Sequence, residues 1–205
     1  MAPNAETQTQ KAQVWLKPEQ VDDLRSATVE QSADYLAPRN DALIATLYDT
    51  GLRVGEAVKL NVDMLDLDES VIGLPAEIQK DYPTDNSPEY TRIGLDDETV
   101  RTLRMYLTNR WKDPAALFPS RQADRMTTES ARNVVRDAAR AAEVRPYTVR
   151  GRGEPEEVTP HTLRHSVAYR MLTREEGNTL YDVTNRLRHA TIQTTERVYA
   201  HFDEV

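Results

Sequence analysis

The stretch HTLRHSVAYR, residues 161–170, contains two of the four histidines in the chain, one on either side of Arg164. Thr159 and Pro160 come directly before it. A threonine that caps the first turn, followed by a proline at the first helical position, is typical of a helix start. The sequence therefore predicts a helix that begins at Pro160 and carries both histidines.

The two faces of this predicted helix differ in character. At 100° per residue, the face expected to pack on the core collects the apolar side chains Leu163, Val167 and Met171. The opposite face collects the polar side chains His161, Arg164 and His165. A polar stripe is also the ordinary pattern of a surface helix, but the other predicted helices use Glu, Asp, Arg and Ala there. The choice of histidine favours a binding site.

Two kinds of site fit a histidine pair with this spacing. His161 and His165 would supply half of a zinc site. A zinc hydrolase of the H-E-x-x-H type, however, needs a glutamate where this chain has Thr162, and Arg164 would place a cation beside the metal. Arginine presents a planar fork of donors that fits two phosphate oxygens, and histidine adds a further donor. An anion site is therefore favoured over a metal site.

A second arginine that could complete such a site lies in TGLRVGEAV, residues 50–58. Arg53 follows Gly51 at a predicted helix start, where backbone N–H groups also favour anions. The alternative is a structural arginine paired with Glu56 one turn later. Both interpretations hold together, because a carboxylate can fix the guanidinium that grips a phosphate.

The composition limits the class of protein. The net charge of −8 by itself argues against a nucleic-acid-binding protein. Residues 1–100 hold 8 Lys and Arg against 20 Asp and Glu, net −12, whereas residues 101–205 hold 18 against 14, net +4. The second half therefore leaves room for a local arginine cluster. Only five of the 26 basic residues are lysine, and an acidic, lysine-poor chain favours a halophilic source.

The chain has no cysteine and no apolar run long enough to span a membrane. Its start, MAPNAETQTQKAQ, lacks the apolar stretch of a secretory signal. We therefore expect no membrane partner, no disulfides and a cytoplasmic location.

Apolar spacing and capping residues predict a mainly α-helical chain with one small antiparallel β-sheet near the middle, an α+β fold. Helices are predicted over residues 16–28, 39–51, 96–111, 127–143, 159–172, 178–189 and 192–201, with a short one starting at residue 52. Strands are predicted over 71–79 and 90–95, joined by a mobile, proline-containing loop over 80–89. Residues 145–160 are predicted to be a loop.

Three motifs in order resemble the catalytic domain of the tyrosine recombinases, the phage integrase family: TGLRVGE at 50–56, HTLRH at 161–165 and LRHATIQTTERVYAH at 187–201. That family's pattern is an arginine in a T-G-x-R-x-x-E box, a lysine on a β-hairpin, an H-x-x-R pair, a histidine or tryptophan, and a tyrosine nucleophile. Each motif alone is weak, whereas three in order with a hairpin between the first two form a strong signal. The resemblance covers about residues 15–202 and implies the catalytic-domain fold of this family.

The resemblance implies roles for six residues. In order, the matching positions are Arg53, Lys80, His161, Arg164, His189 and Tyr199. Glu56 and His165 are expected to support the site from behind. Tyr199 is preferred over Tyr169 and Tyr181 because only Tyr199 follows His189.

Lys80 is the match that depends most on local structure. It is the only lysine between Lys59 and Lys112, and it is predicted to end the first strand of the hairpin. The alternative is a solvated charge with no role in the site.

The resemblance also implies a reaction. The tyrosine would attack a DNA phosphate, form a 3′-phosphotyrosyl link and release a 5′-hydroxyl, which is covalent catalysis without a nucleotide cofactor or a metal ion. The arginines and His189 would bind the phosphate oxygens, His161 would assist proton movement, and Lys80 would protonate the leaving oxygen. Two alternatives remain: a non-catalytic, DNA-binding accessory relative of the same fold, and DNA relaxation of the type IB topoisomerase kind.

The resemblance begins near residue 15, so residues 1–14 are expected to be a disordered lead and 15–205 the catalytic domain. The N-terminal core-binding domain of most members is expected to be absent. Half of a DNA clamp should bind weakly, and salt weakens phosphate contacts further. We therefore expect double-stranded DNA as the partner, in the nucleoid, together with self-association as a dimer or tetramer, or an accessory domain or protein.

Overall fold

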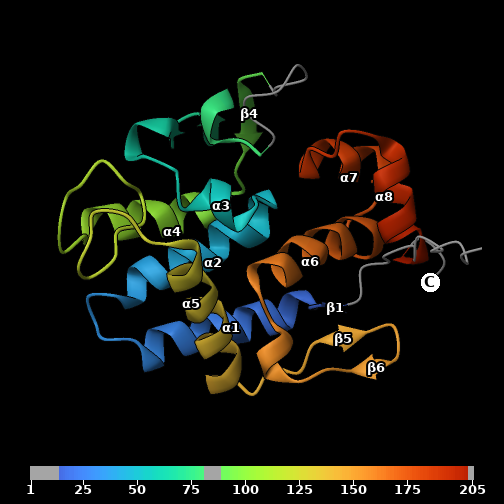
Figure 1. Ribbon diagram of the computed structural model, residues 1–205, viewed down its shortest axis with the longest axis horizontal. Helices are drawn as coiled ribbons and strands as arrows, with labels where there is room; N and C mark the ends of the chain where they lie inside the picture. The colour runs from blue at the N-terminus through green and yellow to red at the C-terminus, as the bar shows by residue number, and fades with distance from the viewer. Residues whose placement is uncertain (1–13, 81–88, 203–205) are drawn as a thin grey trace, which may run out of the picture.

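The computed structural model describes residues 14–80 and 89–202 of the 205-residue chain. Two expectations concern residues outside this part: most of the disordered lead, over 1–13, and most of the mobile loop, over 81–88. Within the described residues the fold is mainly helical with small antiparallel sheets (Figure 1), which confirms the predicted class.

The helices of the described residues lie close to where capping and apolar spacing predict them. They are α1 Pro18–Gln31, α2 Ala37–Thr50, α3 Val54–Ala57, α4 Asp97–Thr108, α5 Thr128–Ala141, α6 Pro160–Thr173, α7 Leu180–Leu187 and α8 Ile192–Tyr199. Short 3₁₀ helices lie at Val62–Met64, Ala76–Ile78, Pro155–Glu157 and Ala200–Phe202. The caps have the expected chemistry: the side chains of Asp96, Thr127 and Thr159 each accept a hydrogen bond from a first-turn amide.

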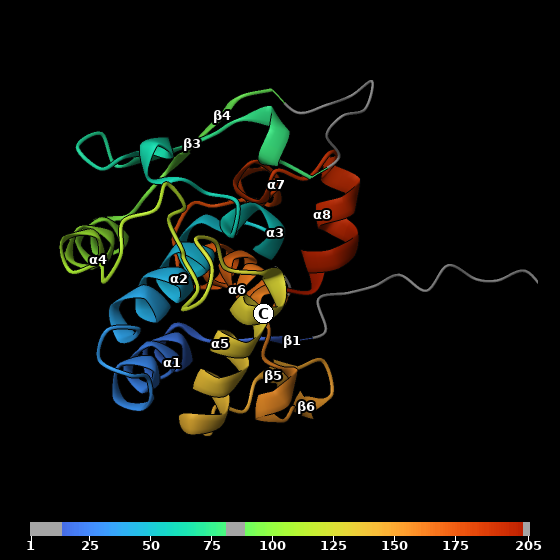
Figure 2. The same cartoon turned by 60° about the vertical axis from the view of Figure 1, so that its left-hand side comes forward.

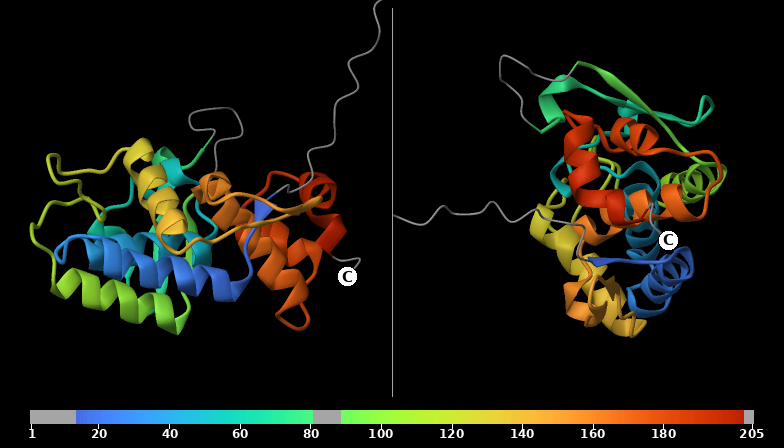
Figure 3. Two further views of the ribbon diagram at one scale, coloured as in Figure 1. Left: turned by 90° about the horizontal axis from the view of Figure 1, so that it is seen from below. Right: turned by 90° about the vertical axis from the view of Figure 1, so that its right-hand side faces the viewer.

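Helix α2 is the centre of the main core. It packs against α1, α4 and α6, and nearly all of its side chains are buried. Helix α1 also packs against α5, and Figure 3 shows these two helices side by side. This rigid helical layer holds the two segments that reach the site, the end of α2 and the start of α6.

One three-stranded antiparallel sheet has the order β2–β3–β4, with β2 at Leu65–Asp66, β3 at Val71–Leu74 and β4 at Thr91–Gly94. It confirms the predicted hairpin but corrects one boundary. The first long strand ends at Leu74, and Pro75 begins a 3₁₀ turn, because a proline has no N–H to continue the ladder. Lys80 therefore follows a turn and does not end a strand.

A second antiparallel sheet, with the order β1–β5–β6, was not expected. It joins β1 at Val14–Trp15 to a hairpin of β5, Tyr147–Thr148, and β6, Gly151–Arg152. The prediction of one sheet and of a loop over 145–160 was therefore wrong. Strands of two residues carry no readable alternation, and their stability comes from pairing with a segment more than 130 residues away.

The three C-terminal helices form a smaller layer beside the main core. Its buried side chains are Val167, Ala168, Met171, Val183, Leu187, Tyr199 and Phe202. Helix α6 joins this layer to the main core, because it contributes Leu163 to the core and packs against α2, α7 and β1. The predicted core side of α6 is confirmed, but the opposite stripe does not face solvent throughout, because Arg164 is only 3% exposed.

Candidate active site

The predicted catalytic residues meet at one cavity of about 590 Å³. All six line it: Arg53, Lys80, His161, Arg164, His189 and Tyr199. His165, Arg197 and Glu157 complete much of the wall. The lining comes from separate segments of the chain, so the fold brings together what the motifs predicted.

The turn between α2 and α3 places Arg53. Gly51 ends α2 with φ +63, and a Cβ at this position would lie 2.5 Å from Leu187 Cδ2. Only glycine fits this close approach without strain. The turn then leaves Arg53 at the start of α3, with its side chain 30% exposed and directed to the cavity.

Arg164 is held much more deeply than Arg53. Its guanidinium donates to the backbone carbonyls of Gly51 and Leu187, which ties α6 to the ends of α2 and α7. Burial, together with the charge of Arg53, lowers the pKa of Arg164 to about 9, so the side chain remains a cation at neutral pH. Two arginines, one buried and one half-buried, therefore face the same cavity.

Glu56 fixes the outer arginine from behind. Its carboxylate accepts hydrogen bonds from the Arg53 backbone at 2.8 Å and the Arg53 guanidinium at 3.2 Å. The Lys80 backbone N–H also donates to Glu56, at 3.3 Å. Burial alone would raise the pKa of Glu56, but Arg188 and these hydrogen bonds lower it overall. Glu56 therefore stays ionised and positions both cationic segments.

Arg188 is a member of this network that the sequence did not reveal. It caps α7 in the left-handed conformation, at φ 53, and its guanidinium donates to Glu56 across 132 residues at 2.8 Å. A residue other than glycine is strained at such a φ. The ion pair with Glu56 therefore offsets the free energy of this backbone strain. The chain has 21 arginines, and nothing in the residue type distinguishes this one.

Tyr199 lies at the floor of the cavity, at the end of α8. The side chain is only 1% exposed, and its hydroxyl is 2.9 Å from His165 Nδ1. Burial raises the pKa of Tyr199 to about 12, against the opposing charges of Arg164 and Arg53. Burial, with neighbouring His161 and Arg164, lowers the pKa of His165 to about 3, so a neutral imidazole holds a protonated phenol.

His189 packs flat against the phenol ring, with centroids 5.9 Å apart and planes 2° from parallel. Its Nδ1 lies 2.8 Å from Thr195 Oγ1, which orients the ring so that Nε2 is left for the cavity. Burial and the nearby arginines lower the pKa of His189 to about 4. His161 is the most exposed of the three site histidines. Its ring packs edge-on against that of His165, with the ring centroids 4.2 Å apart.

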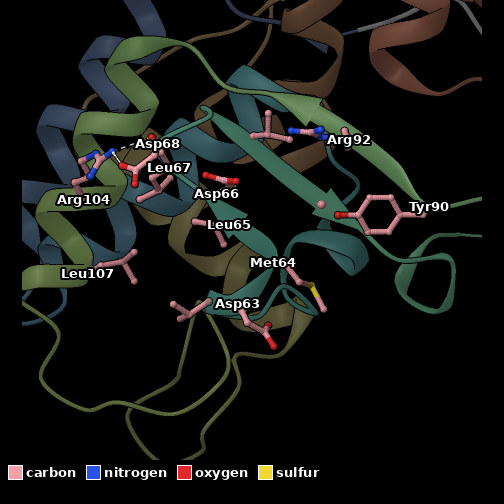
Figure 4. A pocket seen from close by; sticks show the side chains of 13 residues that line it. Asp63, Met64, Leu65, Asp66, Leu67, Asp68, Tyr90, Arg92, Arg104 and Leu107 are labelled. Carbon is pink, nitrogen blue, oxygen red and sulfur yellow. Dashed lines mark hydrogen bonds and ion pairs between the residues drawn. The ribbon is translucent and has the colours of Figure 1, made fainter.

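A larger cavity of about 750 Å³ lies on the β2–β3–β4 sheet (Figure 4). Its rim carries Asp63, Asp66 and Asp68, and Arg104 pairs with Asp68 at 2.6 Å. Among residues 14–80 and 89–202, its lining includes no histidine and one tyrosine, Tyr90. An acidic rim repels phosphate, so size alone does not identify the site.

No group of three or more His, Cys, Asp or Glu side chains is placed to bind a metal ion in residues 14–80 and 89–202. Over the same ranges, no helix has the length and apolar character needed to cross a bilayer.

Tyr199 is thus held beside two arginines and a row of imidazoles on a mainly helical fold, and these cationic donors suit an anionic group such as a phosphate. Comparison with known proteins identifies the family. The model of the phage integrase family matches residues 14–204, and this chain belongs to that family, the tyrosine recombinases.

Two relatives illustrate the similarity in sequence. The tyrosine recombinase XerC of Pseudomonas syringae pv. tomato is 35% identical over 170 residues, which cover 83% of this chain and 50% of the relative. The tyrosine recombinase XerD of Mycobacterium tuberculosis is 33% identical over 163 residues, 78% of this chain and 47% of the relative. The chain thus spans about half the length of the curated relatives it matches. The comparisons give no support for a halophilic source.

Two solved structures illustrate the similarity in fold. The crystal structure of XerA recombinase superposes with a TM-score of 0.71 at 25% identity, over 94% of this chain and 60% of that one. The XerH site-specific recombinase bound to its difH substrate superposes with a TM-score of 0.69 at 20% identity, over 96% of this chain and 53% of that one. These superpositions confirm the tyrosine recombinase catalytic fold.

Proposed function

We propose that this chain cleaves and rejoins DNA strands through a covalent 3′-phosphotyrosyl link to Tyr199. One observation supports this most: separate segments of the chain bring two arginines and three histidines to the cavity whose floor is that tyrosine. A phosphodiester carries a negative charge and needs cationic donors around it, whereas a neutral substrate would not.

In the proposed cleavage step, Tyr199 Oη attacks phosphorus, the new P–O bond forms, and the bond to the 5′-oxygen breaks. The phenol proton passes to His161, the most exposed site imidazole, and the Lys80 ammonium gives a proton to the leaving oxygen. Attack by a 5′-hydroxyl from another strand reverses each transfer and reseals the DNA. No nucleotide cofactor or metal ion enters this balance.

The other residues prepare the site. Arg53, Arg164 and His189 bind the oxygens that gain charge in the transition state, and donors of this kind contribute roughly 3–4 kcal/mol each. His165 has too low a pKa to keep the proton, so it orients the phenol through their 2.9 Å contact. Glu56 keeps Arg53 aimed at the cavity.

The substrate and the assembly on it form the next part of this proposal. XerH recombinase, which shares the fold, is bound to its difH substrate in a solved structure, and the Tn1549 transposon integrase is in complex with transposon right end DNA in another. We extend this to double-stranded DNA in the nucleoid as the substrate here, with a dimer or tetramer on the DNA, or an accessory domain or protein, completing the clamp. Light scattering of the protein with and without duplex DNA measures that assembly.

The test uses a pool of random 30-bp duplexes with a nick in one strand, a design that lets the cleaved end diffuse away. Wild-type protein should form an adduct that survives SDS electrophoresis, and sequencing the captured DNA reads the target. Tyr199→Phe should form none. Tyr181→Phe, at a tyrosine that is 62% exposed, is the matched control and should keep the adduct. A folded wild-type protein that binds the pool without any adduct would support the accessory relative instead.

A further inference from the structure

The hairpin of β5 and β6 carries cations that the site does not use. Arg150 lies at its turn and Arg152 on β6; both are exposed, and the exposed Gly151 lies between them at φ +133. Lys17 lies just beyond β1, the strand that pairs with this hairpin. In a chain of net charge −8, two exposed arginines on one short hairpin form a concentrated positive feature.

Arg150 and Arg152 differ from two other arginines near the hairpin. Arg145 pairs with Glu154 at 2.8 Å, and Arg140, on α5, pairs with Glu156 at 2.9 Å. In the part of the chain that the structure describes, neither Arg150 nor Arg152 has an ion pair. Their charge is therefore available to an external anion.

Arg152 is also held in place without being neutralised. Its guanidinium lies 4.0 Å from the centroid of the Tyr147 ring and donates to the backbone carbonyl of Arg145. Lys17 Nζ lies 4.5 Å from the centroid of the same ring. A cation stacked on an aromatic ring keeps its charge but loses rotational freedom, which lowers the entropy cost of binding.

The hairpin lies beside the site cavity. Val14 lines that cavity, and Val14 pairs with Thr148 of β5. Figures 1 and 2 both place α6 and α8 between the β3–β4 hairpin above and the β5–β6 hairpin below. A long polyanion bound at Tyr199 and extending toward the β5–β6 hairpin would pass along that hairpin.

We propose that the β5–β6 hairpin, through Arg150 and Arg152, binds the backbone phosphates of duplex DNA beside the cleaved position. This inference rests on the proposed function, since it takes the DNA at Tyr199 as its reference. Arginine contacts to phosphates hold the duplex in register without reading bases. The hairpin therefore adds affinity for DNA of any sequence, through phosphates that lie on one side of the scissile phosphate.

Salt dependence tests the proposal, with fluorescence anisotropy of a labelled random 30-bp duplex as the measurement. The variant Arg150→Gln and the double variant Arg150→Gln/Arg152→Gln each remove phosphate contacts. The slope of log affinity against log salt should fall in magnitude by about 0.9 for each contact removed. Thermal melting checks that both variants remain folded.

The matched control is Arg101→Gln/Arg104→Gln, which removes two exposed arginines from α4 on another part of the molecule (Figure 1). It should keep the wild-type slope. Equal slopes for the hairpin variants, the control and wild type would overturn the proposal. If wild type forms a covalent adduct but the hairpin variants keep its slope, only the hairpin proposal fails. If the hairpin variants reduce the slope but wild type forms no adduct, only the proposed function fails.

Discussion

The two largest cavities described above have similar volumes and opposite charge. The cavity at Tyr199, about 590 Å³, is lined by Arg53, Lys80, Arg164 and Arg197, and among the described residues Glu157 is its one carboxylate. The sheet cavity, about 750 Å³, has three aspartates on its rim and two arginines. The smaller one combines positive charge with a nucleophile. A site for DNA cleavage is thus recognised by charge and chemistry, not by volume.

Among the residues around Tyr199, the buried arginine of the positive cavity should have the largest effect on the rate of adduct formation. Arg164→Ala should reduce the rate of adduct formation by about 10²–10³-fold, since it removes a transition-state donor. The melting temperature should also fall, because the carbonyls of Gly51 and Leu187 lose their donor. Single-turnover adduct assays and calorimetry measure the two effects.

Arg39→Ala separates stability from chemistry in that experiment. Arg39 is 5% exposed and donates to the carbonyl of Pro119, outside the site. This variant should melt at a lower temperature and keep the wild-type rate per folded molecule. An equal loss of rate in both variants would mean that Arg164 acts only through folding.

Arg188→Gly should produce a smaller, more selective effect. Glycine relieves the positive φ, worth about 1 kcal/mol, while Glu56 loses a partner. We expect a melting temperature at or near that of wild type with a rate about tenfold lower, as for loss of one charged hydrogen bond. Glu143→Gly, at φ 49 and far from the site network, is the control and should leave the rate unchanged. An unchanged rate in Arg188→Gly would remove Arg188 from the positioning of Arg53.

The histidines of the positive cavity predict a pH dependence of stability. Burial lowers the pKa of His165 to about 3 and of His189 to about 4, whereas unfolded histidine titrates near 6.5. Below pH 6.5 the unfolded chain therefore binds more protons, and stability falls as the pH drops toward these values. Melting between pH 7 and 5 measures this, and His165→Asn should flatten the curve. A wild-type curve with the same slope as the variant would contradict the assignment.

Substitutions in the sheet cavity should have the smallest effect on adduct formation. Asp63→Asn/Asp66→Asn should leave the adduct rate within about twofold of wild type, because neither carboxylate faces the site. Asp68→Asn breaks an exposed ion pair with Arg104, worth roughly 0–1 kcal/mol. Any large loss of adduct in these variants would show that the acidic cavity takes part in the reaction.

Local chemistry explains what the sequence predicted well. Thr159 and Pro160 start α6, and Gly51 ends α2, because caps and left-handed turns depend on adjacent residues alone. Within the site, the H-x-x-R pair and Tyr199 lie on elements with a clear helical period.

Long-range pairing explains what the sequence could not predict. The bond from Arg188 to Glu56 spans 132 residues, and the pairing of β1 with β5 spans a similar distance. Arg164 was expected on a polar face, but α7 folds over that face and supplies the Leu187 carbonyl. Such contacts depend on how the elements pack, which no local pattern contains.

The central claim is that Tyr199 is the residue joined to DNA. Mass spectrometry of the trypsin-digested adduct from the nicked duplex pool tests it directly. We predict a nucleotide 3′-phosphate on the peptide that begins at Val198, with the modification on Tyr199. A modification on any other residue, such as Tyr169 or Tyr181, would contradict it.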